Sequence, residues 1–356
     1  MPRTVLLNPG PVNVTDRVRQ ALMLPDLCHR EKEFTDLMSA IRAKLLKAFD
    51  IEGGFTSALV SGSGTAALEM AVSSSLTPGR SMLVIQNGVY GERIGKICDV
   101  YKFNRHTLKL GWGEPPSLED IENELKQNPD IEVVALVHHE TTTGLLNPLK
   151  EVGELARRYE KVFLVDCISS LAGDEIDFNS IDIAVGTANK CLQGFPGVSF
   201  VLFREKELAR LRKIPERTLY FNLTGNHKAQ EAGGMLFTPA IPAHYALDVA
   251  LDELIEETVA GRVARYARAA RFLRAGFKDI GLEFLIPEGW RSNCLTSLRL
   301  PKGLSYEKLH DGLKANGFVI YAGQGNLSDN IFRIANMGDI TQEEFDRFLK
   351  VLKARL

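Results

Sequence analysis

The stretch KVFLVDCISSLAGDEIDFNSIDIAVGTANKCLQGFPGVSFVLFR, residues 161–204, contains two apolar runs that each lead to a polar side chain. The first run ends at Asp166, and Lys190 follows a few residues after the second. Short apolar runs of this kind predict buried strands. If the two strands are parallel neighbours, their carboxyl ends open into the ligand crevice of an α/β sheet, where the acid and the amine could meet over one ligand.

An acid and an amine in this arrangement suit one chemistry in particular. A lysine forms a Schiff base with pyridoxal phosphate, and a carboxylate pairs with the pyridinium nitrogen so that the ring acts as an electron sink. A surface lysine and a strand-end aspartate of some other α/β protein explain the same stretch. Residues 161–204 alone leave both interpretations open.

The composition is that of an ordinary globular protein. The chain has 356 residues, of which 45% are hydrophobic and 25% are charged, and this length allows two domains. A net charge of −2 gives no reason to expect nucleic acid or an anionic membrane as a partner. No apolar run suits a secretory signal or approaches the ~18 residues of a membrane span, so we expect a cytoplasmic protein.

The cysteines are odd in number, scattered and free of any CxxC pair, which argues against a disulfide framework or a zinc site. Two of them adjoin Asp166 and Lys190, where we expect buried structural thiols. The five are Cys28, Cys98, Cys167, Cys191 and Cys294.

Apolar strands alternate with amphipathic helices through most of the first half of the chain. This order predicts a doubly wound, mostly parallel sheet covered by helices on both faces. The apolar segment 194–203 is expected to return as an antiparallel edge strand. The predicted strands are 56–61, 81–86, 105–110, 132–139, 161–166 and 181–186, and the predicted helices are 65–76, 89–101, 118–126 and 149–159.

The remaining segments predict an arm and a second domain. Pro9-Gly10-Pro11 forbids a helix, so residues 1–15 form an extended arm. Residues 16–249 form the large domain and residues 250–356 a smaller α+β domain. Between them lie an irregular region, 213–238, and a long helix, 243–278. The small domain is expected to contain strands 294–300, 318–323 and 330–336 and helices 305–317 and 341–354.

The loop Ser61-Gly62-Ser63-Gly64-Thr65 lies between a strand and a helix. Glycines let the backbone approach an anion, and a helix amino terminus offers free N–H groups, so Ser63, Gly64 and Thr65 suit a phosphate without any basic residue. The full GxGxxG spacing and a Walker lysine are both missing, and an ordinary tight turn fits the loop as well.

Three further motifs follow predicted strands. Tyr90, in NGVYGER, either lays its ring against a flat ligand or packs on the core. His138, His139 and Glu140 invite a metal site, but neighbours on a strand point to opposite sides, so we predict none. The hydroxyls of Thr141–Thr143 suit a cofactor phenolate or a substrate. Joint agreement of these motifs along one sheet edge favours the cofactor.

Arg333 lies among apolar neighbours in the predicted strand 330–336. A buried arginine in such a place either forms an ion pair or binds an anion, and its planar fork suits a carboxylate or a phosphonate. A position at the boundary between the two domains favours the anion.

The sequence resembles the class V, fold-type I pyridoxal phosphate aminotransferases over nearly its whole length, and in particular the 2-aminoethylphosphonate:pyruvate aminotransferases. The strings most typical of that branch are HETTTG, ANKCLQG and FVIYAG. The others that carry the resemblance are NPGPVNVT, DLCHREKEF, SGSGTAALE, NGVYGER, VDCISS, FTPA and FRIANMGD.

The resemblance implies a role for each motif. It implies that Lys190 forms the Schiff base, Asp166 pairs with the pyridine nitrogen and Tyr90 stacks on the ring. Arg333 would take the substrate's acidic group, with the Gly10 backbone close by. It implies further that Ser63, Gly64 and Thr65 hold the phosphate, that Thr142 lies near the phenolic oxygen, and that Thr238 reaches the cofactor phosphate of the neighbouring subunit in a homodimer with shared active sites.

The implied reaction moves the amino group of 2-aminoethylphosphonate to pyruvate, giving phosphonoacetaldehyde and alanine. Serine or alanine as donor, with glyoxylate or pyruvate as acceptor, is the nearest alternative; such enzymes often carry tryptophan in place of Tyr90, and residues 211–235 match the phosphonate branch less well. A desulfurase would need a mobile catalytic cysteine, and Cys294 lies at a predicted strand entry. A nucleotide-binding or non-catalytic α/β protein is the alternative from another class.

Overall fold

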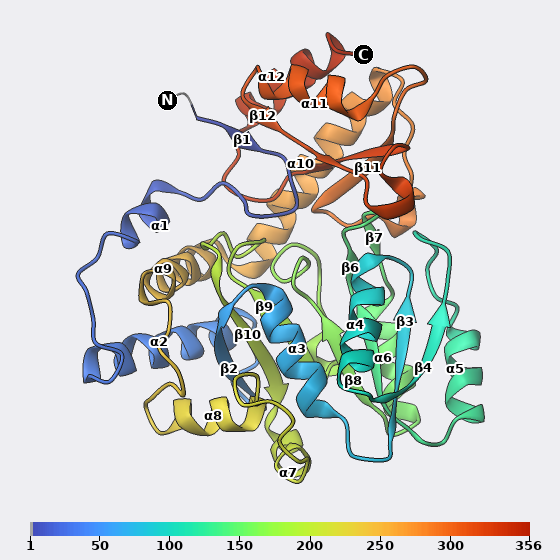
Figure 1. Ribbon diagram of the computed structural model, residues 1–356. Helices are drawn as coiled ribbons and strands as arrows, with labels where there is room; N and C mark the ends of the chain where they lie inside the picture. Colours follow the sequence, from blue (N-terminus) through green and yellow to red (C-terminus); the bar gives the residue numbers. More distant parts are fainter. Residues whose placement is uncertain (1–2) are drawn as a thin grey trace.

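The computed structural model describes residues 3–356, so the first two residues of the predicted arm 1–15 lie outside it. Its centre is a seven-stranded sheet with the strand order β2-β10-β9-β8-β5-β3-β4 (Figure 1). All neighbours from β9 to β4 are parallel, as the alternating sequence predicts. The strands are β2 (Phe55–Gly62), β3 (Ser81–Gln86), β4 (Asn104–Lys109), β5 (Ile131–Val137), β8 (Val162–Asp166), β9 (Ile183–Thr187) and β10 (Gly197–Arg204).

Helices cover both faces of this sheet, and its internal strands are largely apolar and buried for that reason. In β5, Val134 and Leu136 pack into the core on one face, while Val133 and Ala135 pack into the core on the other. The first core includes α2 (Lys32–Ala48), α5 (Leu118–Gln127), α6 (Leu149–Arg158) and α9 (Ile241–Glu257). The second includes α3 (Gly64–Ser75), α4 (Val89–Val100), α7 (Leu208–Leu211) and α8 (Leu223–Glu231).

The strand β10 is antiparallel, as predicted, but its predicted place at an edge of the sheet is wrong. It pairs with β9 on one side and with β2 on the other, and its six central residues are all buried. The outer position belongs to β2. The long apolar run in 194–203 is explained by this central position, because an internal strand has no solvent-facing side.

A smaller carboxyl-terminal part lies above the sheet in Figure 1. It holds a three-stranded sheet in the order β11-β14-β13. The amino-terminal arm joins it, because β1 (Val5–Leu6) pairs in parallel with β12. The elements are α10 (Val259–Asp279), β11 (Leu295–Arg299), α11 (Tyr306–Lys314), β12 (Phe318–Val319), β13 (Tyr321–Ala322), β14 (Ile331–Ala335) and α12 (Gln342–Lys353).

Three predicted segments differ from the structure. The helix 243–278 is two helices, α9 and α10, because Thr258 has a φ of 68° and its side chain caps α10 by accepting from the Gly261 amide. The strand 318–323 is divided between β12 and β13, which pair with different partners. The region 213–238, predicted to be irregular, contains α8, whose amino terminus is capped by Asn222.

Short elements complete the chain. They are α1 (Asp16–Ala21), β6 (His139–Glu140) and β7 (Leu145–Leu146), the last two forming a small hairpin after β5. Within residues 3–356, no helix has the length and apolar character needed to cross a membrane.

A substitution at Gly153 would test how closely α6 packs on the sheet. A Cβ at this helical position would collide with the Ser180 carbonyl and come within 3.0 Å of the Phe163 ring, whereas a Cβ at Gly289 would meet nothing within 4 Å. We expect Gly153→Ala to lower the free energy of unfolding by about 1–3 kcal/mol through overpacking, and Gly289→Ala to change it little. Urea unfolding measures both, and equal stability of the two variants would contradict the packing.

Candidate active site

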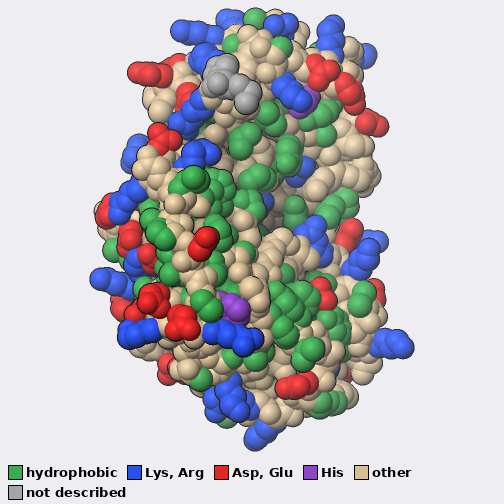
Figure 2. Space-filling model, turned by 60° about the vertical axis from the view of Figure 1, so that its left-hand side comes forward, with side chains coloured by type: hydrophobic (Ala, Val, Ile, Leu, Met, Phe, Trp, Pro, Cys, Tyr) green, Lys and Arg blue, Asp and Glu red, His purple; other side chains and the backbone are tan. Residues whose placement is uncertain are grey.

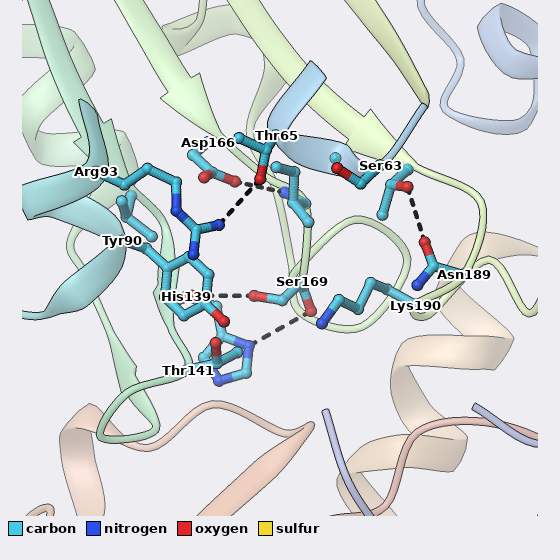
Figure 3. Close-up of a pocket in the computed structure, with 14 residues that line it drawn as sticks. Ser63, Thr65, Tyr90, Arg93, His139, Thr141, Asp166, Ser169, Asn189 and Lys190 are labelled. Carbon is cyan, nitrogen blue, oxygen red and sulfur yellow. Dashed lines mark hydrogen bonds between the residues drawn. The ribbon is translucent and has the colours of Figure 1, made fainter. Parts of the chain in front are cut away.

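A cavity of about 150 Å³ opens at the carboxyl ends of the parallel strands and contains most of the predicted site residues (Figure 3). Six of them line it: Ser63, Gly64, Thr65, Tyr90, Asp166 and Lys190. The other lining residues are Arg93, Val137, His139, Thr141, Ile168, Ser169, Thr187 and Asn189.

Asp166 is the last residue of β8, and it is 4% exposed. Its Oδ1 accepts a hydrogen bond of 2.9 Å from the Ile168 amide. Burial raises the pKa of Asp166 to about 6, although the Ile168 amide and the cations Arg93 and Lys190 act in the opposite direction. A carboxylate held away from water in this way favours a cationic partner in the cavity.

Lys190 follows β9, and its Nζ donates to the carbonyl of Pro9 in the amino-terminal arm. Burial lowers the pKa of this amine to about 8, and the cations Arg333 and Arg93 lower it further. The arm lies against the lysine so closely that a Cβ on Gly10, whose φ is +101°, would come within 2.6 Å of Cδ and 2.9 Å of Nζ. A buried amine that deprotonates readily is suited to nucleophilic and acid–base chemistry.

The amino terminus of α3 is open to an anion. Ser63 is the N-cap residue, yet its side chain accepts no capping hydrogen bond, whereas Thr15 and Ser117 cap α1 and α5 with theirs. The first amides of a helix have no acceptor within the helix, so those at Gly64 and Thr65 remain for a ligand. These donors fit a phosphate group.

The amino terminus of α4, by contrast, is occupied by the protein. Glu140 accepts from the amides of Tyr90 and Gly91 at 3.2 and 3.1 Å, and burial raises the pKa of this carboxyl. The pairing fixes Tyr90 at the cavity wall. Arg93, one turn further along, lies over the Tyr90 ring at 4.6 Å from its centroid.

Four of the predicted residues are not among those that line the cavity: Thr142, Thr238, Arg333 and Gly10. The Thr142 hydroxyl is buried and already bonded, since it donates to Glu140 at 2.6 Å and accepts from the Val89 amide at 3.0 Å. Its neighbour Thr141 lines the cavity instead. Thr238 is exposed and is not among the lining residues.

Arg333 lies in β14 and reaches the site from the carboxyl-terminal part. It is 3% exposed. Its Nε donates to the Ala322 carbonyl and its Nη1 to the Thr141 carbonyl, both at 2.8 Å. Within residues 3–356, no carboxylate oxygen lies within 4.0 Å of it, and burial lowers its pKa. The guanidinium therefore keeps a charge that an anionic ligand could neutralise.

His138 and His139 face different spaces. His139 lines the cavity, where its Nδ1 lies 3.4 Å from the Ser169 carbonyl, whereas His138 lines a separate cavity beside Trp290. Burial lowers the pKa of each imidazole to about 3, so both are neutral. The alternation of side chains along the strand separates the two rings, as the sequence indicates.

Sequence reasoning missed several residues of the cavity. Arg93 had a usable signal, because residues three apart on a helix share a face and Tyr90 was already a candidate. Asn189 directly precedes Lys190 in the sequence, and Thr187 is the last residue of β9, the strand that leads to both. Ser169 and Ile168 lie in a turn without any periodic pattern, so only the folded chain reveals them.

Comparison with known proteins identifies the family. The model of the family "Aminotransferase class-V" matches residues 19–324. This chain belongs to the class V aminotransferases. The family, together with relatives named as transaminases, shows that the chain is a pyridoxal-phosphate-dependent transaminase, with the fold-type I architecture.

Two relatives are equally similar in sequence. An uncharacterized aminotransferase of Methanocaldococcus jannaschii is 36% identical over 348 residues, covering 96% of this chain and 90% of the relative. A 2-aminoethylphosphonate–pyruvate transaminase of Syntrophobacter fumaroxidans is 36% identical over 356 residues, covering 98% and 95%. The structure of an alanine–glyoxylate aminotransferase from Nostoc sp. matches with a TM-score of 0.92 and 28% identity, covering 100% of this chain and 96% of that one.

The raised pKa of Asp166 predicts how the cofactor-free protein responds to pH. Folding favours the protonated carboxyl, whose pKa rises from 3.8 to about 6, so the cost of burying the charge is absent below pH ~4 and complete above pH ~6. We expect Asp166→Asn to melt at a higher temperature than the wild type at pH 8, and at nearly the same temperature at pH 4.

The matched control is Asp346→Asn, because Asp346 is exposed on α12. Its melting temperature should follow that of the wild type at both pH values. A lower melting temperature of Asp166→Asn than of the wild type at pH 8 would contradict the prediction. It would mean that neighbouring groups of the cofactor-free protein compensate the buried charge of Asp166.

Proposed function

We propose that this class V aminotransferase moves the amino group of 2-aminoethylphosphonate to pyruvate, giving phosphonoacetaldehyde and alanine. Relatives named for that reaction support it at about 35% identity over nearly the whole chain. The observation in the site that carries it is Arg333, a buried guanidinium without a carboxylate partner in the described chain. Phosphonate and carboxylate, the acidic groups of the two substrates, both suit a guanidinium.

Pyridoxal phosphate, when bound, supplies a carbonyl that takes up the amino group and a ring that accepts negative charge. In our proposal the amides of Gly64 and Thr65, with Ser63, bind its phosphate at the open end of α3. Asp166 holds a proton on the ring nitrogen, which the buried carboxylate is suited to do. Tyr90 covers one face of the ring.

Lys190 moves the proton during transfer. Its amine would take the proton from the substrate carbon that bears the amino group and, as the ammonium, would deliver it to the cofactor carbon that takes up the amino group. A pKa of about 8 lets the same group serve as base and then as acid. Gly10 and Pro9 hold the arm over the lysine and limit access of water. The phenolic contact that Thr142 was expected to make falls more naturally to Thr141, which lines the cavity.

The partner subunit and the domain division belong to the same proposal. Thr238 is exposed outside its own cavity, so we propose a homodimer in which it reaches the partner's cofactor phosphate. Figure 2 shows many apolar side chains around a hollow on the face that carries α1 and α2. Met23 and Leu24, after α1, are 86% and 46% exposed, which suits burial against a second copy. We place the boundary of the large domain, 16–249, before the last turns of α9.

An alanine or serine donor with glyoxylate is the second candidate. The similarity in fold to the Nostoc alanine–glyoxylate aminotransferase favours it. Both reactions use the same lysine, aspartate and arginine, so the donor decides between them.

Replacement of Lys190 tests the cofactor. The wild-type protein with pyridoxal phosphate should absorb visible light because the cofactor is bound covalently to the lysine amine. Lys190→Ala should lose this band and at least a thousandfold in activity. The control is Lys308→Ala, which changes an exposed lysine of α11. A wild-type protein that stays colourless with added cofactor would refute the cofactor assignment.

A donor panel tests the substrate. We expect 2-aminoethylphosphonate with pyruvate to give the highest kcat/KM, and Arg333→Gln to lower kcat/KM for both substrates by about 10²-fold or more, since a buried charged contact is lost. Arg299→Gln, in the exposed end of β11, should leave both values unchanged. Turnover of alanine with glyoxylate, without any of the phosphonate, would favour the second candidate.

A further inference from the structure

Arg93 is a cation that the cavity does not neutralise. It comes from α4 and lines the cavity, and its guanidinium lies between Thr65 and Tyr90 in Figure 3. Within residues 3–356, no carboxylate oxygen lies within 4.0 Å of it. Its Nη1 donates to the Thr65 hydroxyl at 3.1 Å.

That hydrogen bond determines where the Thr65 hydroxyl can donate. A threonine hydroxyl has one hydrogen and two lone pairs. Arg93 donates to a lone pair, so the hydrogen of Thr65 stays available for another acceptor. Thr65 stands in the first turn of α3, where the side chain of Ser63 leaves the amides uncapped. The hydroxyl hydrogen and the amides are therefore donors to one anion.

The same guanidinium supports Tyr90. It lies over the ring at 4.6 Å from the centroid, a distance at which a cation is attracted to an aromatic face. One face of the ring is thus held by Arg93. The backbone of Tyr90 is fixed separately by Glu140, so ring and backbone each have their own support.

We propose that Arg93 is a positioning residue for the cofactor, which orients the Thr65 hydroxyl toward the phosphate and holds the Tyr90 ring against the pyridine. The inference rests on the proposed function, because it requires pyridoxal phosphate in this cavity. It also gives the phosphate site a basic residue that the loop Ser61–Thr65 lacks in its own sequence.

The charge of Arg93 has a second consequence within the cavity. Arg93 and Lys190 are the two cations that lower the pKa of Asp166. The lysine changes its charge whenever its amine reacts or transfers a proton, whereas a guanidinium stays charged throughout. Arg93 is therefore a permanent cation that favours the ionised form of Asp166 against the effect of burial.

The test is a double-mutant cycle on the dissociation constant of pyridoxal phosphate, measured by titration of the cofactor-free protein. Arg93→Met and Thr65→Val should each weaken binding about tenfold. Because Arg93 is proposed to act partly through Thr65, the double variant should bind at most a few-fold more weakly than Thr65→Val, rather than about a hundredfold more weakly than the wild type. Thermal melting of each cofactor-free variant checks that it is folded, and Arg93→Gln replaces Arg93→Met if the latter does not fold.

Pyridoxal, which lacks the phosphate, separates the two roles of Arg93. Its binding should weaken in Arg93→Met by only a few-fold, because only the support of the Tyr90 ring is lost. The control is Arg347→Met, since Arg347 lies over the Phe318 ring at 4.2 Å, outside the cavity. It should bind both ligands like the wild type.

The outcomes are distinguishable. Binding of pyridoxal phosphate by Arg93→Met within about twofold of the wild type overturns the inference, and so does a double variant whose loss equals the product of the two single losses. An equal loss of pyridoxal and pyridoxal phosphate also overturns the role of Thr65. In each of these cases the wild type still binds the cofactor and the proposed function stands. A wild-type protein that binds no pyridoxal phosphate would refute both the inference on Arg93 and the proposed function.

Discussion

The site depends on the burial of two opposite charges at the ends of adjacent parallel strands. Asp166 ends β8 and Lys190 follows β9, and the two strands pair so that Asp166 lies opposite Val185. Each side chain is moved by burial toward its neutral form, the acid to a pKa of about 6 and the amine to about 8. The amino-terminal arm covers Lys190 through the Pro9 carbonyl, and Arg93 favours the charged form of Asp166 but disfavours that of Lys190.

The second constraint comes from the backbone amides at the amino termini of two helices, α3 and α4, of which the protein itself occupies one set. Both α3 and α4 begin at the edge of the sheet where ligands bind, and both have free amides at their first turn. Glu140 occupies the terminus of α4, whereas the cap of α3 makes no side-chain bond. A protein carboxylate thus occupies the amino terminus of α4 and leaves that of α3 open, and the open terminus is where we propose that the phosphate binds.

Much of the sheet and part of the site follow from the sequence alone. Continuous apolar runs such as β8 predict parallel buried strands, and the carboxyl ends of parallel strands share one edge, so Asp166, Lys190 and the Ser63–Thr65 loop could be placed together. The order of strands could not be read, because β10 and β2 are both apolar and only pairing decides which is internal. The break at Thr258 depends on a positive φ, which no propensity of threonine predicts.

The choice between adjacent residues is where sequence reasoning ends and geometry begins. Three threonines, 141–143, offer the same hydroxyl, and the structure bonds Thr142 to Glu140 while Thr141 lines the cavity. Glu140, which binds the Thr142 hydroxyl, is only two residues away in the sequence. The amides that fix Glu140, however, come from Tyr90 and Gly91, some fifty residues earlier in the chain. The helix α4 therefore serves the site twice: its first amides hold the carboxylate that binds the Thr142 hydroxyl, and its next turn brings Arg93 to Thr65. Because one helix does both, the Tyr90 ring and the proposed phosphate donor Thr65 are positioned by contacts with a single element.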